Sequence, residues 1–254
     1  MRICILTAMG SERARIAQLL ADRREMPFGL SRVATTDIGL TAEQRLAPRR
    51  CAVGRIGANE VVLAETGIGK VNAAIGAVEL IHEFRPDCLV STGVAGGIDA
   101  SLRVMDVVVA TVGAYHAVDC GTGNVRGQVQ GLPPRFAGDP RLVAAAQRAA
   151  EGLGATARVA FGLICSGDQF ISDRAALDAI KAAFPDGLAV EMESGALAQT
   201  CFLHGIPFLG FRIVSDTPGV EGHVEQYKDF WGEMADHSFA VARAFLEALP
   251  ESLG

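Results

Sequence analysis

Strand-like and helix-like stretches alternate along almost the whole chain, and this alternation restricts the fold more than any other feature of the sequence. Apolar runs, several of them rich in β-branched residues, read "RICILTAM", "VMDVVVATVGA", "ARVAFGLICSG", "GLAV" and "PFLGFRIVS". Helical periodicity is found at Ile16, Leu19 and Leu20 and over residues 71–84, 140–152, 173–183, 194–204 and 230–249. Such alternation is typical of a mostly parallel sheet with helices on both faces. We therefore predict an α/β protein with three αβα layers and a twisted, mostly parallel sheet.

The size and composition of the chain fit one domain. Its 254 residues are 50% hydrophobic and 20% charged, which suffices for one full core, so we expect residues 1–254 to form a single domain. No apolar run reaches the roughly 18 residues of a membrane-spanning helix. The start "MRICILTAMGSE" has too short an apolar part for a secretory signal, so we expect a cytoplasmic protein.

The charge and the metal-ligating residue types argue against nucleic acids and metal ions. A net charge of −6, with no block of Lys or Arg, lacks the positive footprint of nucleic-acid binding. The six cysteines contain no C-x-x-C pair and the five histidines no H-x-x-x-H pair, so we predict neither a zinc site nor a disulfide framework. We expect no metal, no cofactor, no nucleic acid and no membrane partner, and predict a small-molecule pocket instead.

Three segments are expected to be less regular. Residues 31–67 have the alternation of short strands separated by turns, with a hairpin at "CAVGRIGANEVVLAETG". "DCLVSTGVAGGID" predicts a strand that breaks into a glycine-rich loop. Residues 117–138 carry glycines, prolines and few large apolar residues, which predicts a long irregular loop.

Polar clusters follow five of the expected strands. They are Glu12, "TGVAGG", "SGDQF", Glu191 with Glu193, and Ser215 with Asp216. In open α/β sheets, ligands bind beyond the carboxyl ends of the strands. We therefore expect these clusters to converge on one edge of the sheet.

Three of these clusters also have a purely structural interpretation. The glycines of "STGVAGGID" let a backbone approach a ligand, or merely allow a tight strand exit. They do not form G-x-G-x-x-G, and "GIGK" lacks the spacing of a phosphate-binding loop. Glu191 and Glu193 suit chemistry at a strand end, or the positive end of a helix dipole. Ser215 and Asp216 before Pro-Gly are also ordinary turn residues.

Two side chains fit a ligand site better than a core. Arg212 lies within an apolar strand, where a guanidinium requires a carboxylate or a ligand, and Glu12 or Glu193 could supply the carboxylate. Phe170 lies just past a strand end. Phenylalanine is most often buried in a core, but a planar ligand would use such a ring for stacking.

Six motifs in this order cover nearly the whole chain and resemble one family. They are "TAMGSE", "ETGIGKVNAA", "STGVAGGID", "GLICSGDQFI", "VEMESGALA" and "FRIVSDTPG". They resemble the nucleosidases that cleave 5′-methylthioadenosine and S-adenosylhomocysteine, within the purine nucleoside phosphorylase superfamily. The resemblance implies a nucleoside phosphorylase-like fold with a mixed sheet, and a homodimer whose partner subunit helps close the 5′ pocket.

The resemblance also assigns roles. Glu12 would hold and deprotonate the attacking water, Glu193 would grip the ribose hydroxyls, and Met192 would lie against the sugar. Asp216, oriented by Ser215, would carry the proton to purine N7, while Phe170 would stack on adenine and backbone groups at Ile171 would read its edge. Glu191 would support the site and Arg212. The remaining residues expected in substrate binding are Met9, Ala95, Gly96 and Tyr227, the last in a pocket-wall segment, "VEQYKDFWGEMADHSF", with Phe230 and Trp231.

These roles agree with the chemistry of N-glycosidic cleavage. Positive charge builds on the ribose as the base departs, so a carboxylate fixed at the sugar stabilises the transition state. A protonated Asp makes the purine a neutral leaving group. Superfamily members that act on 6-oxopurines have Asn at the position of Asp216, so the resemblance implies that the base is adenine.

Two departures and three alternatives remain at this point. Val94 stands where such nucleosidases commonly have Ser, and Thr7 replaces a usual Gly, which affects how firmly the water is held. A phosphorylase would use phosphate in place of water. Leu89, Val90 and Ser91 stand where phosphorylases supply Arg, but Arg13 and Arg15 could contribute to a phosphate site. A non-enzymatic adenine-nucleoside binder would not need both Glu12 and Asp216. A nucleosidase for another 5′-substituted adenosine, such as aminodeoxyfutalosine, also fits.

Overall fold

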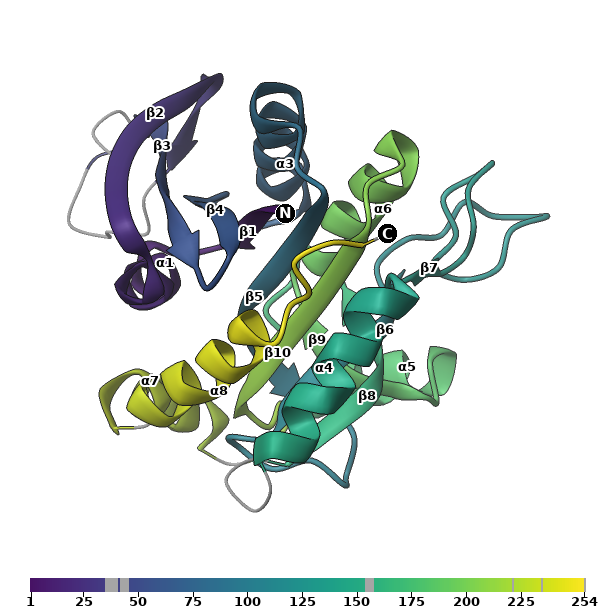
Figure 1. Ribbon diagram of the computed structural model, residues 1–254. Coiled ribbons are helices and arrows are strands. Elements are labelled where there is room, and N and C mark those ends of the chain that lie inside the picture. The colour runs from purple at the N-terminus through teal and green to yellow at the C-terminus, as the bar shows by residue number, and fades with distance from the viewer. Residues whose placement is uncertain (35–40, 42–45, 154–157, 221, 234, 254) are drawn as a thin grey trace.

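One mixed β-sheet runs through the protein and helices pack on both of its faces (Figure 1). The computed structural model describes residues 1–34, 41, 46–153, 158–220, 222–233 and 235–253. Its strands are β1 (Arg2–Thr7), β2 (Ala21–Ala34), β3 (Leu46–Ile56), β4 (Asn59–Glu65), β5 (Cys88–Gly97), β6 (Val107–Tyr115), β7 (Phe136–Ala137), β8 (Val159–Ser166), β9 (Gly187–Glu191) and β10 (Phe208–Asp216). The helices are α1 (Gly10–Ile16), α3 (Lys70–Phe84), α4 (Pro140–Leu153), α5 (Arg174–Ala183), α6 (Ser194–His204), α7 (His223–Glu233) and α8 (Ala235–Glu247), and a 3₁₀ turn, η1 (Ala17–Leu19), follows α1.

The sheet combines two parallel groups joined by antiparallel pairs. β4, β1, β5 and β10 pair in parallel, as do β6, β8 and β9. β10 pairs antiparallel with β6, and β9 antiparallel with β5. Because β10 pairs with both β5 and β6, the five strands β5, β10, β6, β8 and β9 form a closed ring. β1, β4, β3 and β2 extend from this ring, and the short strand β7 pairs with β6. The predicted mixed sheet and three-layer α/β fold are therefore confirmed.

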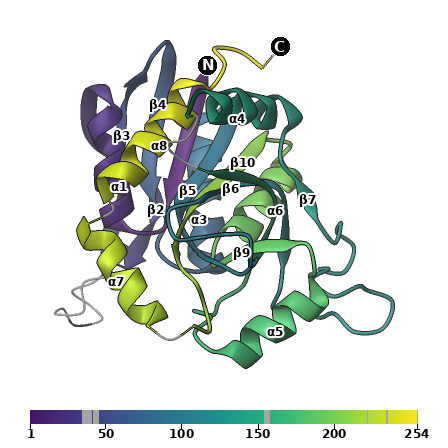
Figure 2. The same ribbon diagram turned by 90° about the horizontal axis from the view of Figure 1, so that it is seen from below.

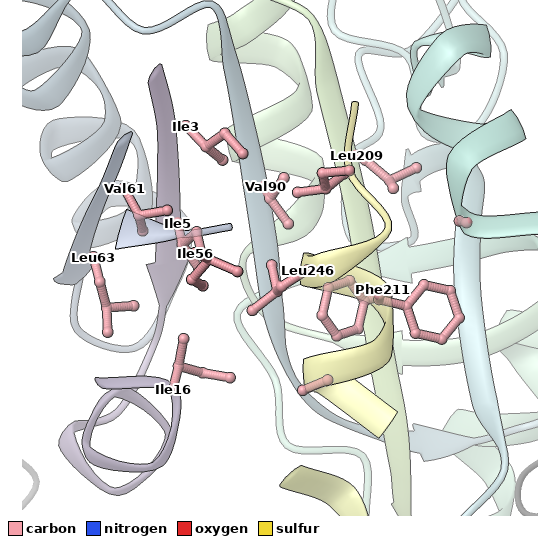
Figure 3. Packing of buried hydrophobic residues seen from close by; sticks show 14 of the residues in the cluster. Ile3, Ile5, Ile16, Ile56, Val61, Leu63, Val90, Leu209, Phe211 and Leu246 are labelled. Atoms are coloured by element: carbon pink, nitrogen blue, oxygen red, sulfur yellow. The ribbon is translucent and has the colours of Figure 1, made fainter. Parts of the chain in front are cut away.

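Alternating side chains of the central strands explain why both faces are covered. In β1, Ile3 and Ile5 belong to one core cluster, while Cys4 and Leu6 belong to another on the opposite face. The first cluster packs against α1, α4 and α8, and the second against α3 and α6. Figure 3 shows the first cluster, in which Phe211 of β10 stacks on Phe245 of α8 with ring centroids 5.3 Å apart.

Three local predictions were wrong. β2 begins at Ala21, well before the strands expected from residue 31, because it is an edge strand paired antiparallel to β3. Pro27 and Gly29 accompany a shift in that pairing, which conceals the strand in the sequence. The expected helix over 230–249 is two helices, α7 and α8, and the first begins at His223.

The third correction concerns the glycine-rich loop, which does not exist as a loop. β5 continues to Gly97, because β10 pairs with it from Gly93 to Gly96 and β9 pairs with Gly96 and Gly97. The glycines are thus strand residues inside the closed ring.

Other local predictions were right. β3 and β4 form the expected antiparallel hairpin, and residues 117–138 are irregular except for the short strand β7. Among the residues that the structure describes, no helix is both long and apolar enough to cross a membrane.

Candidate active site

A single cavity gathers the carboxyl ends of five strands. Its walls come from the segments after β1, β8 and β9 and from the last residues of β5 and β10. β9 runs antiparallel to β5, but only Gly96–Val190 and Gly97–Ala189 pair, so the carboxyl ends of both strands still meet. Figure 2, seen from below, shows α5 and α7 on either side of this end of the molecule. The expected convergence of the polar clusters is therefore confirmed as a geometric fact.

Twelve of the thirteen residues predicted for the site line this cavity. They are Met9, Glu12, Ala95, Gly96, Phe170, Ile171, Glu191, Met192, Glu193, Ser215, Asp216 and Tyr227. The thirteenth, Arg212, is only 3% exposed and lies behind the cavity wall. The structure thus brings the predicted set together from elements that are far apart in the sequence.

Glu12 is held in place by three backbone N–H groups. It lies in the first turn of α1, where Oε2 accepts from Ala8 N and Met9 N, both at 3.0 Å. Oε1 accepts from Val94 N in β5 at 3.1 Å. Gly93 allows this close approach, since a Cβ there would overlap the carboxylate. Burial raises the pKa of Glu12, although Arg212 and the N–H donors oppose this change. A carboxylate with a raised pKa is a better base.

Glu193 lies between β9 and α6 and reaches across to a third element. Its Oε1 accepts from the Gly69 N–H at 2.8 Å, just before α3, while its Oε2 accepts no hydrogen bond from the residues that the structure describes. Burial, and after it the charge of Glu191, raises the pKa of Glu193 to about 8. One oxygen is therefore anchored and the other can meet a ligand.

Glu191, in contrast, is fully occupied by protein donors. Its Oε2 accepts from Glu193 N at 3.1 Å, Ser194 N at 2.8 Å and Arg212 Nη2 at 2.9 Å. Its Oε1 accepts from the Ser166 hydroxyl, which in turn accepts from Gly195 N. The spacing of two residues places Glu191 at the end of β9 and Glu193 at the N-cap of α6. Two similar residues consequently have different surroundings.

Of the two expectations for Arg212, the one implied by the resemblance, support by Glu191, agrees with the structure. The reasoning from the residues alone suggested Glu12 or Glu193, but the guanidinium pairs with Glu191, and it also donates to Ser91 Oγ at 2.8 Å. Arg212 lies in β10 and points toward the end of β9, so the nearest carboxylate is the last residue of that strand. Burying both ions together meets the requirement that a buried charge be paired.

The opposite wall carries Asp216 and the ring-bearing residues. Asp216, 3% exposed, accepts from the Ser215 hydroxyl at 2.7 Å. Phe170 is 53% exposed and meets the ring of Tyr227 edge to face, with centroids 5.6 Å apart. The Tyr227 hydroxyl lies 3.9 Å from the Met9 sulfur. An exposed aromatic ring at a cavity mouth suits stacking on a planar ligand.

Some lining residues were missed or have a different reason for their identity. Ala8, Ile68, Gln169, Val190 and Pro218 also line the cavity. A Cβ at Gly96 would come 2.6 Å from Pro218, so packing against Pro218 explains why this residue is glycine. Of the expected pocket wall, Phe230 belongs to the core, and the Trp231 side chain lies outside the described residues.

The two departures noted in the sequence occupy defined places. Val94 lines the cavity and gives its backbone N–H to Glu12. The Thr7 hydroxyl donates to Met9 O at 3.3 Å, which ties down the turn before α1. Within the described part of the chain, no group of three or more His, Cys, Asp or Glu side chains is arranged to hold a metal ion.

Comparisons with known proteins agree with this geometry. A family model described as the phosphorylase superfamily matches residues 2–247. A 5′-methylthioadenosine/S-adenosylhomocysteine nucleosidase of Chromohalobacter salexigens is 39% identical over 98% of this chain and 97% of its own length. The nucleosidase of the same name from Anoxybacillus flavithermus is 37% identical, with 98% and 99% covered.

Solved structures of such nucleosidases have the same fold. The enzyme from Neisseria meningitidis, in complex with methylthio-immucillin-A, matches with a TM-score of 0.85 and 34% identity over 98% of this chain and 99% of that one. The enzyme from Colwellia psychrerythraea, in complex with adenine, matches with a TM-score of 0.86 and 32% identity over 100% and 97%.

Proposed function

The chain belongs to the phosphorylase superfamily and, within it, to the 5′-methylthioadenosine/S-adenosylhomocysteine nucleosidases, and we propose how its own residues divide the reaction. It is an N-glycosidic hydrolase: the bond between adenine and the 5-thioribose moiety of these nucleosides is cleaved by water. The assignment of residues below is our proposal.

One observation carries the proposal, namely the arrangement of three acidic side chains around one cavity. Glu12 and Glu193 lie on the sides formed by β1, β5 and β9, whereas Asp216 lies at the end of β10, beside the turn to α7. Breaking an N-glycosidic bond needs a base for the water, negative charge at the sugar and an acid at the departing purine. The cavity offers one carboxyl group for each task.

Glu12 activates the water. Three backbone N–H groups fix its orientation, and burial raises its pKa, which makes it a stronger base toward the water. Its neighbour Val94 contributes only a backbone donor, hence the water is oriented by Glu12 and not by a hydroxyl at position 94.

Glu193 serves the sugar. Its unanchored Oε2 accepts hydrogen bonds from ribose hydroxyls, and its negative charge stabilises the cationic ribose of the transition state. Met192 lies beside it along the cavity and packs on the sugar face. Glu191, saturated by Ser166, Arg212 and two backbone N–H groups, holds Glu193 in place and does not touch the substrate.

Asp216 serves the base. The Ser215 hydroxyl fixes its Oδ1, and the carboxyl donates a proton to N7 as the bond breaks, so that adenine leaves as a neutral molecule. The exposed Phe170 ring stacks on the purine, with backbone groups at Ile171 along its edge. Met9 and Tyr227 flank the 5′ substituent.

Water fits this site better than phosphate as the nucleophile. A phosphate site needs a fixed cation near Glu12, and the buried cation there, Arg212, is already paired with Glu191 and Ser91. Because Arg212 is already paired, its surroundings disfavour cleavage by phosphate.

We further propose a cytoplasmic homodimer that acts in methionine salvage and nucleoside catabolism. Ile68, Val71 and Ile75, at and just before α3, are exposed, as are Phe202 and Leu203 at the end of α6. These two helices lie side by side (Figure 1) and expose apolar side chains along their length, which a second copy would cover. All six cysteines are free, as is usual in a reducing compartment. We also propose that residues 1–254 form one domain.

The test is release of adenine from methylthioadenosine and from S-adenosylhomocysteine by the parent and by Glu193→Gln. The amide keeps the shape but removes the charge, so we expect a loss in kcat on the order of 10²-fold. If the kcat of Glu193→Gln stays within about threefold of that of the parent, Glu193 does not act on the sugar. If the parent itself releases no adenine from either nucleoside, the whole assignment is refuted.

A further inference from the structure

The amino-terminal end of α3 is held by two carboxylates that come from other elements. The first N–H groups of a helix have no acceptor within the helix, and the N-cap of α3, Gly69, has no side chain to provide one. Gly69 N instead donates to Glu193 Oε1 at 2.8 Å, and Lys70 N donates to Asp168 Oδ1 at 2.7 Å. Neighbouring peptide groups thus bind one proposed catalytic carboxylate and one carboxylate that has no role so far.

The two hydrogen bonds are mechanically linked through Gly69. This residue has a φ of +94°, a conformation open to glycine but strained for other residues, so its backbone rotates easily unless both flanking peptides are fixed. A Cβ at Gly69 would lie 3.1 Å from Asp168 Oδ1, which shows how closely the carboxylate is seated against this turn. A hydrogen bond that fixes the Lys70 N–H therefore also fixes the direction of the Gly69 N–H.

Asp168 has a second contact with the same helix end and is tied to the other side of the site. Its Oδ2 lies 3.7 Å from Lys70 Nζ, which itself lies 5.4 Å above the centre of the Tyr115 ring. The preceding residue, Gly167, donates its N–H to Glu191 O at 3.0 Å. The following residues, Gln169 and Phe170, line the cavity. Asp168 thus joins the adenine-side loop after β8 to the α3 end that holds Glu193.

We propose that Asp168 is a positioning residue: by accepting the Lys70 N–H, it aims the Gly69 N–H at Glu193 and keeps that carboxylate correctly placed at the sugar. The inference rests on the proposed role of Glu193. Asp168 itself does not touch the substrate and acts only through the turn at Gly69.

Replacing Asp168 by Ala and by Asn separates the hydrogen bond from the charge. Ala removes the acceptor, so the Gly69 turn loosens and Glu193 loses the donor that favours its ionised form. We expect kcat to fall about tenfold or more, with a smaller change in KM, because a small displacement of a catalytic group is costly. We also expect the acid limb of kcat/KM to move to higher pH by about half a unit or more. The amide oxygen of Asn still accepts from Lys70 N, so Asp168→Asn should keep kcat within about threefold and should not show that upward shift.

A matched control lies five residues further along the same loop. Asp173 accepts from Ala176 N at 2.8 Å as the N-cap of α5, which makes Asp173→Ala an equal loss of one capping bond without contact to α3. Asp173→Ala should keep the parent kcat and pH profile.

The outcomes are distinguishable from failure of the proposed function. Parent-like activity and pH profile in Asp168→Ala, combined with an inactive Glu193→Gln, overturn the positioning role alone. Equal impairment of Asp168→Asn and Asp168→Ala, or of Asp173→Ala and Asp168→Ala, also overturns it, because charge or general loop stability would then explain the loss. An active Glu193→Gln removes the proposed role of Glu193, on which this inference rests. Impairment confined to Asp168→Ala, with the shifted acid limb, supports the inference.

Discussion

At the scale of single residues, the site depends on acidic groups that the fold buries with too few cations. Glu12, Glu191, Glu193 and Asp216 are all buried, and Arg212 forms its ion pair with Glu191. Burial of the other carboxylates raises the pKa of Glu12 and of Glu193. The substrate-free site consequently disfavours full ionisation, which a developing positive charge on the ribose would relieve.

This burial predicts how stability changes with pH. The pKa of Glu193 rises from an ordinary 4.5 to about 8 on folding, so the folded state binds a proton more tightly than the unfolded state. The resulting stabilisation is complete below about pH 4.5 and is lost as pH rises toward 8. Glu193→Gln lacks this dependence. We expect its melting temperature, relative to that of the parent, to increase from pH 5 to pH 8 in thermal unfolding. A difference that stays constant over this range would show that Glu193 is ionised at low pH in the folded protein.

Asp216 allows binding and catalysis to be separated. In Asp216→Asn, the amide can still donate a hydrogen bond to N7 but cannot release a proton as the bond breaks. We expect kcat on methylthioadenosine to fall by roughly 10²- to 10⁴-fold, with a much smaller change in the substrate dissociation constant. A 4-nitrophenyl 5-thioriboside needs no protonation of its leaving group and should be far less affected. Equal losses on both substrates would mean that Asp216 supports the site and is not the acid.

At the scale of elements, the contact between α1 and β5 fixes the position of the Glu12 carboxylate in the cavity. Gly93 of β5 faces Glu12 so closely that a Cβ would overlap its carboxylate, and the next residue, Val94, gives Glu12 a backbone N–H. The sequence suggested these glycines for a ligand-binding loop. Gly93 instead leaves room for Glu12 of α1, and Gly96 leaves room for Pro218.

Gly93→Ala tests this junction. The added methyl group must displace Glu12 or α1, so we expect kcat to fall by about 10²-fold, the cost of moving a catalytic group by roughly 1 Å. Gly152→Ala is the matched control, because a Cβ at this position in α4 meets no atom within 4 Å. Its kcat should equal that of the parent, and Ala should stabilise the helix slightly. If steady-state assays find Gly93→Ala as active as the control, the position of Glu12 does not depend on that contact.

The sequence was informative about elements whose pattern is local. Helix α6 begins and ends where its periodicity predicted, and the strands around the site were found from their apolar runs. What the sequence could not show depends on contacts across the sheet. The extension of β5 through its glycines requires β10 and β9 as partners, and β2 is a strand only because β3 pairs with it.

The same limit applies to the site residues. Most of the twelve predicted residues that line the cavity lie at or just after the end of a recognisable strand. The pairing of Arg212 with Glu191, however, depends on the closed ring. Ile68 was missed because it lies in the turn between β4 and α3, where the glycines of "GIGK" were the only signal. Asp168 was missed because its importance comes from a backbone N–H of a distant helix.

At the scale of the whole molecule, the exposed apolar side chains of α3 and α6 predict self-association. Val71 is 69% exposed and Leu203 60% exposed, which is costly in water if no partner covers them. We expect light scattering at micromolar concentration to give twice the monomer mass of 26.6 kDa. Val71→Asp should shift the protein toward the monomer, because a buried unpaired charge opposes association. Leu30→Asp, fully exposed on β2, is the control and should stay dimeric. A parent protein that is monomeric would refute the dimer.

The identity of the sugar product tests the central claim, that a water held by Glu12 attacks the ribose. The measurement is mass spectrometry of the products from methylthioadenosine in phosphate buffer, where both nucleophiles are present. Attack by water yields adenine and free 5-methylthioribose, and the rate should not depend on phosphate concentration. Formation of 5-methylthioribose 1-phosphate would contradict the hydrolytic mechanism, and it would require a phosphate-binding cation that the pairing of Arg212 with Glu191 does not leave available.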